Sequence, residues 1–322
     1  MNSTTIPDLI EINQAADRIR PYLHVTPVLT SNAINSIAGC SIFFKCENFQ
    51  KAGVFKARGA TNAVFSLNEK ELSKGVATHS SGNHAAALSL AASLRKTKAY
   101  IVMPSNSNKV KIKAVENYGG IIRFCEPNLK SREETLDTVI KETGAHEIHP
   151  YNDVRIIAGQ ATAAKELFDQ VDELDIIMSP VGGGGLLSGT ALSARYFGPE
   201  KIKVIAAEPI GADDAYRSFY SKTLVPSVSP NTLADGLLTS LGSITYEIIL
   251  KHVNAILTAS DQQIVEAMRL VWERMKMIIE PSSAVPLAVI LKNKKTFEGK
   301  KVGIIVSGGN VDLDNLPFSM SH

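Results

Sequence analysis

Short apolar runs alternate with amphipathic segments along most of this chain, and this alternation constrains the fold more than any other feature. The runs have the length of strands and span residues 41–46, 75–78, 100–103, 121–124, 175–178, 203–207, 255–258 and 302–306. Continuous apolar strands separated by helices are typical of mostly parallel sheets that helices cover on both faces. We therefore expect an α/β protein. Ser131 is expected to begin one helix, because Glu134 follows at the spacing of a capping box.

Length, charge and cysteine content exclude several classes of protein. The 322 residues exceed one average domain, so two lobes or one large α/β unit are expected. A net charge of +2 without a dense basic block predicts no nucleic-acid partner. The 3 cysteines contain no CxxC pair, which argues against a disulfide framework and a structural zinc site. The chain has no signal pattern and no apolar run of about 18 residues, so we expect a cytoplasmic location and no membrane contact.

One lysine has neighbours that suit covalent chemistry. The segment Gly53-Val54-Phe55-Lys56-Ala57-Arg58-Gly59-Ala60 places Lys56 between an aromatic residue and the start of an expected helix. A lysine is nucleophilic only as the neutral amine, which requires burial or a nearby cation to lower its pKa. We expect Phe55 to provide the apolar flank and Arg58 the positive charge. The segment also fits a surface lysine in a loop that opens a helix, because short motifs often match by chance.

A run of four glycines indicates a phosphate site. Residues 182–185 follow an expected strand and precede an expected helix, so their backbone N–H groups and the helix N-terminus can bind a phosphate. The loop lacks the Lys-Ser/Thr pair of a Walker motif and fits the GxGxxG spacing poorly. It predicts either a phosphate site that needs no magnesium or a sharp, closely packed turn.

Two further turns follow expected strands. Asn83 and Ser81, in the segment His79-Ser80-Ser81-Gly82-Asn83-His84, present a side-chain amide and a hydroxyl, although the two serines also suit simple helix capping. Ser307, in Ser307-Gly308-Gly309-Asn310, ends the last strand, where open α/β sheets bind ligands. A plain turn of small residues is the alternative for that segment.

An acidic segment follows another expected strand. Glu208 to Asp214 contains two carboxylates and a loop carbonyl that can hold a hard cation such as Mg²⁺ or Ca²⁺. Acidic loops of this kind also occur as solvated or helix-capping segments. The segment alone therefore leaves both interpretations open.

Taken in order, these segments resemble the motifs of the fold-type II pyridoxal-phosphate enzymes, specifically the serine racemase and serine/threonine dehydratase group. The resemblance runs from Ile12 to Asp312 and is greatest to the eukaryotic-type serine racemases. It rests on Phe-Lys-x-Arg-Gly-Ala at 55–60, Ser-Ser-Gly-Asn-His at 80–84, the glycines at 182–185, the segment 208–214 and Ser-Gly-Gly-Asn at 307–310. Five motifs in the family's order are far more specific than any single one.

The resemblance implies a fold, an assembly and a role for each matching residue. The fold would be two open, twisted, mostly parallel sheets flanked by helices, as in the tryptophan synthase β-like enzymes. A large domain would take residues 1–74 and 152–322, a small domain residues 75–151, and the protein would be a homodimer. Lys56 would hold pyridoxal 5'-phosphate as a Schiff base, and Ser81 would act as acid and base on the opposite face of the cofactor.

The other implied contacts fall into three groups. The cofactor would be bound by Phe55 beside its ring, Asn83 at its hydroxyl, Ser307 at its ring nitrogen, and the backbone of Gly182, Gly183, Gly184, Gly185 and Leu186 at its phosphate. The substrate carboxylate would meet the turn of Ser80, Ser81, Gly82, Asn83 and His84. A divalent cation (Mg²⁺, Ca²⁺ or Mn²⁺) would be held by Glu208, the carbonyl of Ala212, and Asp214.

The implied activity is racemisation of serine together with β-elimination from serine or threonine to a keto acid and ammonia. L-serine, D-serine and L-threonine would be the substrates. A β-hydroxyaspartate dehydratase or a catabolic L-threonine dehydratase has the same catalytic set. The alternative of another class is a metabolite-binding protein without turnover. That alternative predicts loss of Lys56 or Ser81, and both residues are present.

Overall fold

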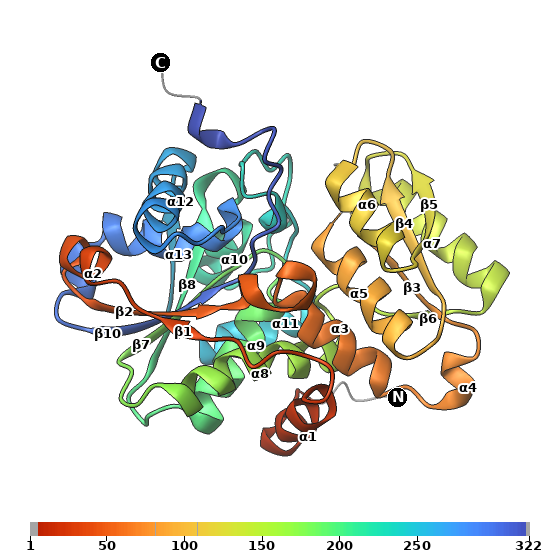
Figure 1. Cartoon of the computed structure of the whole chain (residues 1–322), viewed down its shortest axis with the longest axis horizontal. Coiled ribbons are helices and arrows are strands. Elements are labelled where there is room, and N and C mark those ends of the chain that lie inside the picture. The colour runs from red at the N-terminus through yellow and green to blue at the C-terminus, as the bar shows by residue number, and fades with distance from the viewer. Residues whose placement is uncertain (1–5, 81, 108, 320–322) are drawn as a thin grey trace.

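The strands form two separate sheets (Figure 1). The computed structural model describes residues 6–80, 82–107 and 109–319. Within them one sheet has six strands in the order β1-β2-β10-β7-β8-β9, and the other has four in the order β5-β4-β3-β6. Every pairing between named strands is parallel except that of β1 with β2 at the edge of the larger sheet. The expected α/β class with mostly parallel sheets is therefore confirmed.

The strand bounds follow the apolar runs of the sequence closely. The larger sheet consists of β1 (Val28–Leu29), β2 (Ser41–Cys46), β7 (Ile176–Pro180), β8 (Lys203–Pro209), β9 (Ala255–Ala259) and β10 (Lys301–Val306). The smaller sheet consists of β3 (Val76–His79), β4 (Ala99–Pro104), β5 (Ile121–Cys125) and β6 (His146–Glu147). The short strands β1 and β6 carry too few residues to produce an apolar run, and no run predicted them.

Helices cover both faces of each sheet, as continuous apolar strands require. One face of the larger sheet packs against α2 (Asn32–Ala38), α12 (Asp261–Met275) and α13 (Pro281–Lys292), and the other against α8 (Val154–Gln170), α9 (Gly185–Phe197) and α11 (Ser243–His252). The smaller sheet lies between α5 (Asn83–Leu94) with α6 (Lys109–Asn117) on one face and α7 (Leu129–Thr143) on the other.

The other helices are shorter or peripheral. They are α1 (Leu9–Ile19), α3 (Lys56–Phe65), α4 (Glu69–Leu72), α10 (Asp214–Ser221) and α14 (Lys294–Phe297), with 3-10 turns at Glu47–Phe49, Lys51–Gly53, Ile210–Ala212, Asp235–Leu237 and Pro317–Ser319. Helix α3 packs against both α5 and α8 and so connects the two sheets. None of the helices in the described residues is long and apolar enough to cross a bilayer.

The expected start of helix α7 is wrong. The helix begins at Leu129, and its N-cap is Asn128, whose side chain accepts a hydrogen bond from the N–H of Ser131 at 2.8 Å. The Ser131 hydroxyl instead accepts from the N–H of Glu126 at 3.1 Å. Asparagine is as good an N-cap as serine. Asn128 and Ser131 could therefore both cap this helix, and the Ser-x-x-Glu spacing favoured the residue that does not.

The chain enters the smaller sheet at β3 and leaves it after β6. We propose a large domain of residues 1–74 and 152–322 and a small domain of residues 75–151 on the basis of this path. Strands β3, β7 and β10 all end where a motif segment begins, at Ser80, Val181 and Ser307. The carboxyl ends of parallel strands are where open α/β sheets bind ligands.

Candidate active site

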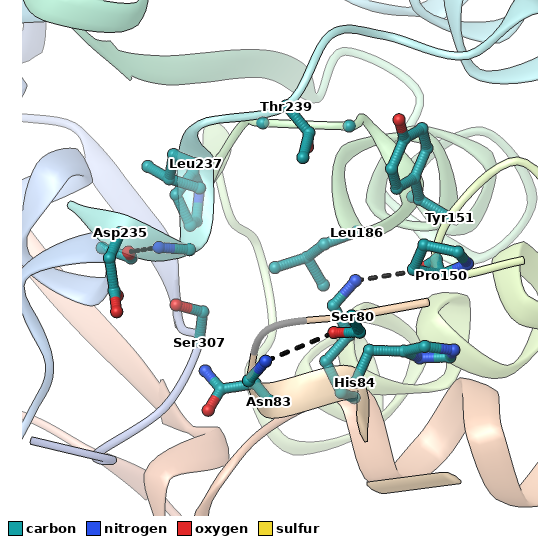
Figure 2. Close-up of a pocket in the computed structure, with 18 of the residues that line it drawn as sticks. Ser80, Asn83, His84, Pro150, Tyr151, Leu186, Asp235, Leu237, Thr239 and Ser307 are labelled. Carbon is teal, nitrogen blue, oxygen red and sulfur yellow. Dashed lines mark hydrogen bonds between the residues drawn. The ribbon is translucent and has the colours of Figure 1, made fainter. Parts of the chain in front are cut away.

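The predicted motifs meet in one pocket (Figure 2). Its lining includes Phe55, Lys56, Ser80, Gly82, Asn83, His84, the glycines 182–185, Leu186 and Ser307. The four segments come from the start of α3, the β3–α5 turn and the ends of β7 and β10, which are far apart in the sequence. Ser81, the second predicted catalytic residue, lies outside the described residues.

Backbone pairing locks two of the motifs together. The N–H of Phe55 donates to the carbonyl of Ser307 at 2.9 Å, and the N–H of Gly309 donates to the carbonyl of Gly53 at 2.9 Å. Gly53 has a φ of 68°, and a Cβ there would lie 2.6 Å from the side-chain oxygen of Asn310. Glycine is therefore required at the start of the lysine motif because the last motif packs directly against it.

Lys56 begins helix α3, and its amine points into the pocket. Its Nζ donates a hydrogen bond to the carbonyl of Pro150 at 2.8 Å and lies 5.2 Å from the centre of the Phe55 ring. The side chain is partly accessible through the pocket, but the surrounding protein desolvates the ammonium and lowers the pKa of Lys56 to about 8. The negative charge of Glu280 opposes this shift. The neutral amine, which covalent chemistry requires, is therefore a minor species of roughly one tenth at pH 7, but far more abundant than for an exposed lysine.

The expected contribution of Arg58 to this shift is wrong. Arg58 is buried away from the pocket lining and donates to both carboxylate oxygens of Glu47, at 2.6 and 2.9 Å, and of Glu166, at 2.6 and 2.8 Å. Two carboxylates neutralise its charge, so the low pKa of Lys56 comes from burial. Arg58 instead ties α3 to α8 and to the 3-10 turn at Glu47–Phe49.

The glycine loop has the geometry of an anion site. Gly184 has a φ of 88° and caps α9. Within the described residues the N–H groups of Gly182, Gly183 and Gly184 donate no hydrogen bond, so they are free to bind a ligand beside the N-terminus of α9. A Cβ at Gly183 would collide with the ring of Tyr151. The loop thus fits a phosphate group and tolerates no side chain at that position.

Ser307 presents a fixed hydroxyl. The side chain is 2% exposed, and its Oγ lies 2.9 Å from the Oγ of Ser283. Ser283 in turn donates to the carbonyl of Gly308 at 2.7 Å and accepts from the N–H of that residue. Ser283 is a positioning residue that no sequence motif indicated, since it lies inside an apolar helix.

Asn83 is held by a buried carboxyl group that the sequence did not indicate. Its Nδ2 donates to both oxygens of Glu280, at 3.1 and 3.0 Å, and its Oδ1 accepts from Asn310 at 2.9 Å. Burial, together with the negative charge of Asp235, raises the pKa of Glu280 to about 7. Glu280 is the N-cap residue of α13, next to Pro281. An acid before a proline is common at helix starts, so nothing in the local sequence distinguishes Glu280 as a site residue.

The histidines around Lys56 are neutral. Burial lowers the pKa of His84 well below its usual value and that of His149 to about 4. The Nε2 of His84 lies 3.4 Å from the carbonyl of Ile148, and its Nδ1 is buried without a hydrogen-bond partner in the described part of the chain. These rings therefore add no positive charge around the lysine at neutral pH.

Several polar residues complete the walls of the pocket. Tyr151 and Thr239 lie across the pocket from Asn83 and Ser307 (Figure 2), and Lys111, Arg132 and Asp235 also line it. The Nε of Arg132 is buried and makes no hydrogen bond within the described residues. These residues lie on helices and loops without a distinctive motif, and only the fold brings them to the site.

The predicted cation ligands lie together, away from the pocket lining. Glu208 is the last residue but one of β8, and its carboxylate accepts from the N–H groups of Ala215 and Tyr216 at 2.9 and 2.7 Å. Burial raises the pKa of Glu208 well above its usual range and that of Asp214 to about 6. The carboxylate of Asp214 is buried and forms no hydrogen bond that meets normal geometry within the described residues. No cluster of three or more His, Cys, Asp and Glu side chains suited to a metal occurs among those residues, so a cation here would need backbone or water oxygens as well.

Comparison with known proteins agrees with this geometry. Residues 19–308 match the family described as "Pyridoxal-phosphate dependent enzyme". The chain is 53% identical to the beta-hydroxyaspartate dehydratase of Paracoccus denitrificans over 98% of this chain and 99% of that protein. It is 52% identical to the serine racemase of Dictyostelium discoideum, over 96% of each chain. The crystal structure of the Dictyostelium enzyme superposes with a TM-score of 0.91, covering 95% of this chain and 99% of that one.

Proposed function

The chain belongs to the pyridoxal-phosphate-dependent enzymes, and from that premise we propose that it is a serine racemase that also dehydrates serine and threonine. The observation that carries this proposal is the position of Lys56. Its partly neutral amine faces the same pocket as a loop of free N–H groups at 182–184 and the fixed hydroxyl of Ser307. An amine, a phosphate site and a neutral hydroxyl are the three contacts that a pyridine aldehyde phosphate needs.

The residues present fit this cofactor. We propose that Lys56 holds it, that the backbone at 182–186 binds its phosphate, that Phe55 flanks its ring, and that Asn83 and Ser307 meet the ring hydroxyl and nitrogen. When bound, pyridoxal phosphate supplies an electron sink that makes the α-proton of an attached amino acid acidic. Glu280 and Asn310 keep the Asn83 amide in one orientation through hydrogen bonds of 2.9 to 3.1 Å.

Two groups would move the α-proton. The Nζ of Lys56 takes it on one face of the substrate, and the hydroxyl of Ser81 returns one on the other face, which inverts the α-carbon. Loss of the α-proton and of the β-hydroxyl, together as water, would instead give an enamine, and its hydrolysis by water releases ammonia and leaves the keto acid. Ser307 is a neutral partner for the ring nitrogen and does not force it to be protonated, so elimination can compete with reprotonation. The turn at 80–84 would bind the substrate carboxylate, because it carries the N-terminus of α5.

We also propose a divalent-cation site at Glu208, the carbonyl of Ala212, and Asp214. Both carboxyl groups are buried, and the charge of Asp214 contributes to the raised pKa of Glu208. Two buried carboxylates must be neutralised by protons or by a cation. The Asp214 carboxylate forms no hydrogen bond of normal geometry in the described part of the chain, which favours a cation such as Mg²⁺, Ca²⁺ or Mn²⁺.

A homodimer and a cytoplasmic location complete the proposal. Val25, Phe49 and Ile278 have exposed apolar side chains on three neighbouring segments, with exposed fractions of 67%, 49% and 48%. Hydrogen bonds from their neighbours, His24 to Gln50 and Asn48 to Ile278, hold these three segments side by side. A second copy of the chain would cover this patch. The three cysteines are buried free thiols, which suits the reducing cytoplasm.

The test is a product assay on purified protein with the cofactor bound. L-serine, D-serine and L-threonine should each yield keto acid, and either enantiomer of serine should yield the other. Lys56→Ala should remove both activities and the visible absorption of the bound cofactor. Protein that gains no visible absorption with added pyridoxal phosphate, or that binds it without acting on any of these amino acids, would contradict the proposal.

β-Hydroxyaspartate dehydration is a second candidate. A relative with that name is 53% identical to the chain, and two cationic side chains besides Lys56, Lys111 and Arg132, line the described pocket. A substrate with two carboxylates would use both of them. L-threo-3-hydroxyaspartate therefore belongs in the same product assay.

A further inference from the structure

An ion pair joins the two sides of the pocket. Lys111 lies in α6, which packs beside the smaller sheet, and Asp235 begins the 3-10 turn at Asp235–Leu237, which packs against α13 of the larger sheet. The Nζ of Lys111 contacts the Oδ2 of Asp235 directly, and both residues line the pocket. The side chain of Lys111 is 17% exposed and that of Asp235 is 50% exposed. The reaction proposed above assigns no role to this pair.

The ammonium of Lys111 lies against the turn proposed to bind the substrate carboxylate. A Cβ built on Gly82 would lie 2.8 Å from the Cδ and 3.2 Å from the Nζ of Lys111. Lys111 and Asp235 also act on the buried Glu280, whose pKa the lysine lowers and the aspartate raises. The pair therefore lies within electrostatic range of a small ligand in the pocket.

The cations of the pocket are not equally available. Arg132 lines the pocket and forms no ion pair among the described residues, so its guanidinium can meet one carboxylate. Lys111 is already neutralised by Asp235. An amino acid with one carboxylate leaves this ion pair intact. An amino acid with a second carboxylate must displace Asp235 from Lys111, or place its own charge next to that of Asp235.

We propose that Asp235 sets the preference of the pocket between one-carboxylate and two-carboxylate amino acids by occupying Lys111. This rests on the proposed function, because it concerns the substrate of the same site. With Asp235 in place, serine and threonine are favoured over 3-hydroxyaspartate. With Lys111 released, its ammonium binds the β-carboxylate. Asp235 thus repels the β-carboxylate of the substrate as well as neutralising Lys111. Repulsion of the wrong ligand is a common source of specificity.

The test compares Asp235→Asn with a matched control. Lys165 and Asp169 form an ion pair at 2.9 Å with side-chain exposures of 21% and 58%, close to those of the pocket pair, and neither residue lines the pocket. The measured quantity is kcat/KM for L-threo-3-hydroxyaspartate divided by that for L-serine. Asp235→Asn should raise this ratio about 3- to 10-fold, the size expected for removing one partly exposed charge opposite a carboxylate. Asp169→Asn should leave it unchanged.

Lys111→Gln provides the second arm. It should lower the ratio below that of the unmodified enzyme, and adding it to Asp235→Asn should remove the gain. The proposal is overturned if Asp235→Asn lowers kcat/KM equally for both substrates, or if Lys111→Gln leaves kcat/KM for 3-hydroxyaspartate unchanged. Asp235 would then be only a contact between the two sides of the pocket.

A binding measurement separates this inference from the proposed function. Succinate and propionate, titrated calorimetrically into the cofactor-loaded protein, differ by one carboxylate and undergo no reaction. Asp235→Asn should tighten succinate about 3- to 10-fold and leave propionate unchanged. If the protein turns over no amino acid but succinate behaves in this way, the proposed function fails and the inference stands. If succinate and propionate shift together, the inference fails whatever the turnover.

Discussion

Arg58 should be the most costly residue to replace outside the pocket. Its side chain is fully buried and donates to Glu47 at 2.6 and 2.9 Å and to Glu166 at 2.6 and 2.8 Å, with Thr162 at 3.2 Å. Methionine is unbranched and of similar length, so Arg58→Met removes the charge and leaves little empty space. The perturbation is therefore electrostatic.

The loss of stability in Arg58→Met depends on which partners Glu47 and Glu166 retain when the guanidinium is removed. Glu166 is 22% exposed and retains Lys45, whose Nζ lies 2.7 Å away. Glu47 is fully buried, and the side-chain hydrogen bond that it retains among the described residues comes from the hydroxyl of Thr26, at 2.6 Å. Removing one partner of a buried pair and leaving the other charge unpaired costs about 3–5 kcal/mol. We expect Arg58→Met to lower the free energy of unfolding by that amount, and Arg58→Lys by about half of it, because an ammonium cannot bridge both carboxylates.

The assay is urea unfolding followed by circular dichroism, with the same saturating concentration of cofactor for every variant. Arg20→Met is the control, since the pair of Arg20 with Asp17 has exposed fractions of 73% and 70% and should contribute less than about 0.5 kcal/mol. The double variant Arg58→Met/Glu47→Gln should recover much of the loss, because no unpaired charge is left. A loss below about 1 kcal/mol in Arg58→Met, or an equal loss in the double variant, would refute this reasoning.

Three other outcomes are expected. The rate at which cofactor-free protein takes up pyridoxal phosphate should rise about tenfold per pH unit and level off above the pKa of Lys56, about 8, because only the neutral amine reacts. The rate is measured by stopped-flow absorbance, and a rate that does not depend on pH would contradict this expectation. Ser81→Ala should abolish racemisation and the attack on D-serine but retain elimination from L-serine, so an equal decline for both enantiomers in the keto-acid assay would exclude two separate faces. The pKa of Asp214, raised from 3.8 to about 6, means that the folded state holds a proton that the unfolded state releases, so stability falls as the pH rises through this window. Added Mg²⁺ should therefore raise the Tm more above pH 6 than below pH 4, and it should do so less in Asp214→Asn.

The strands were predictable because each apolar run is a local signal. All eight expected runs coincide with strands to within one or two residues, and parallel order follows from burial on both faces. Helix α7 was misplaced at its start because Asn128 and Ser131 compete as N-caps, and local spacing cannot rank them. Strands β1 and β6 gave no signal, since two residues pair only where the neighbouring strand already lies.

The motif residues of the pocket were also predictable, because glycine loops and strand-end turns carry their chemistry in short segments. The electrostatics were not. Arg58 stands two residues after Lys56 in the sequence, yet its charge is directed at Glu47 and Glu166. Burial sets the pKa of Lys56, and Glu280, distant by more than 200 residues, opposes it.

The sequence by itself determined the α/β class, the strands, and the segments that could hold a phosphate and an amine. Those are properties of neighbouring residues, which the spacing of side chains expresses directly. Only the tertiary structure decided which polar and charged groups face one another: Glu280 and Asn83, Asp235 and Lys111, and Ser283 and Ser307. Such pairings depend on distances between chain segments that meet only after folding. They also depend on burial, because an interaction between polar groups is stronger away from water.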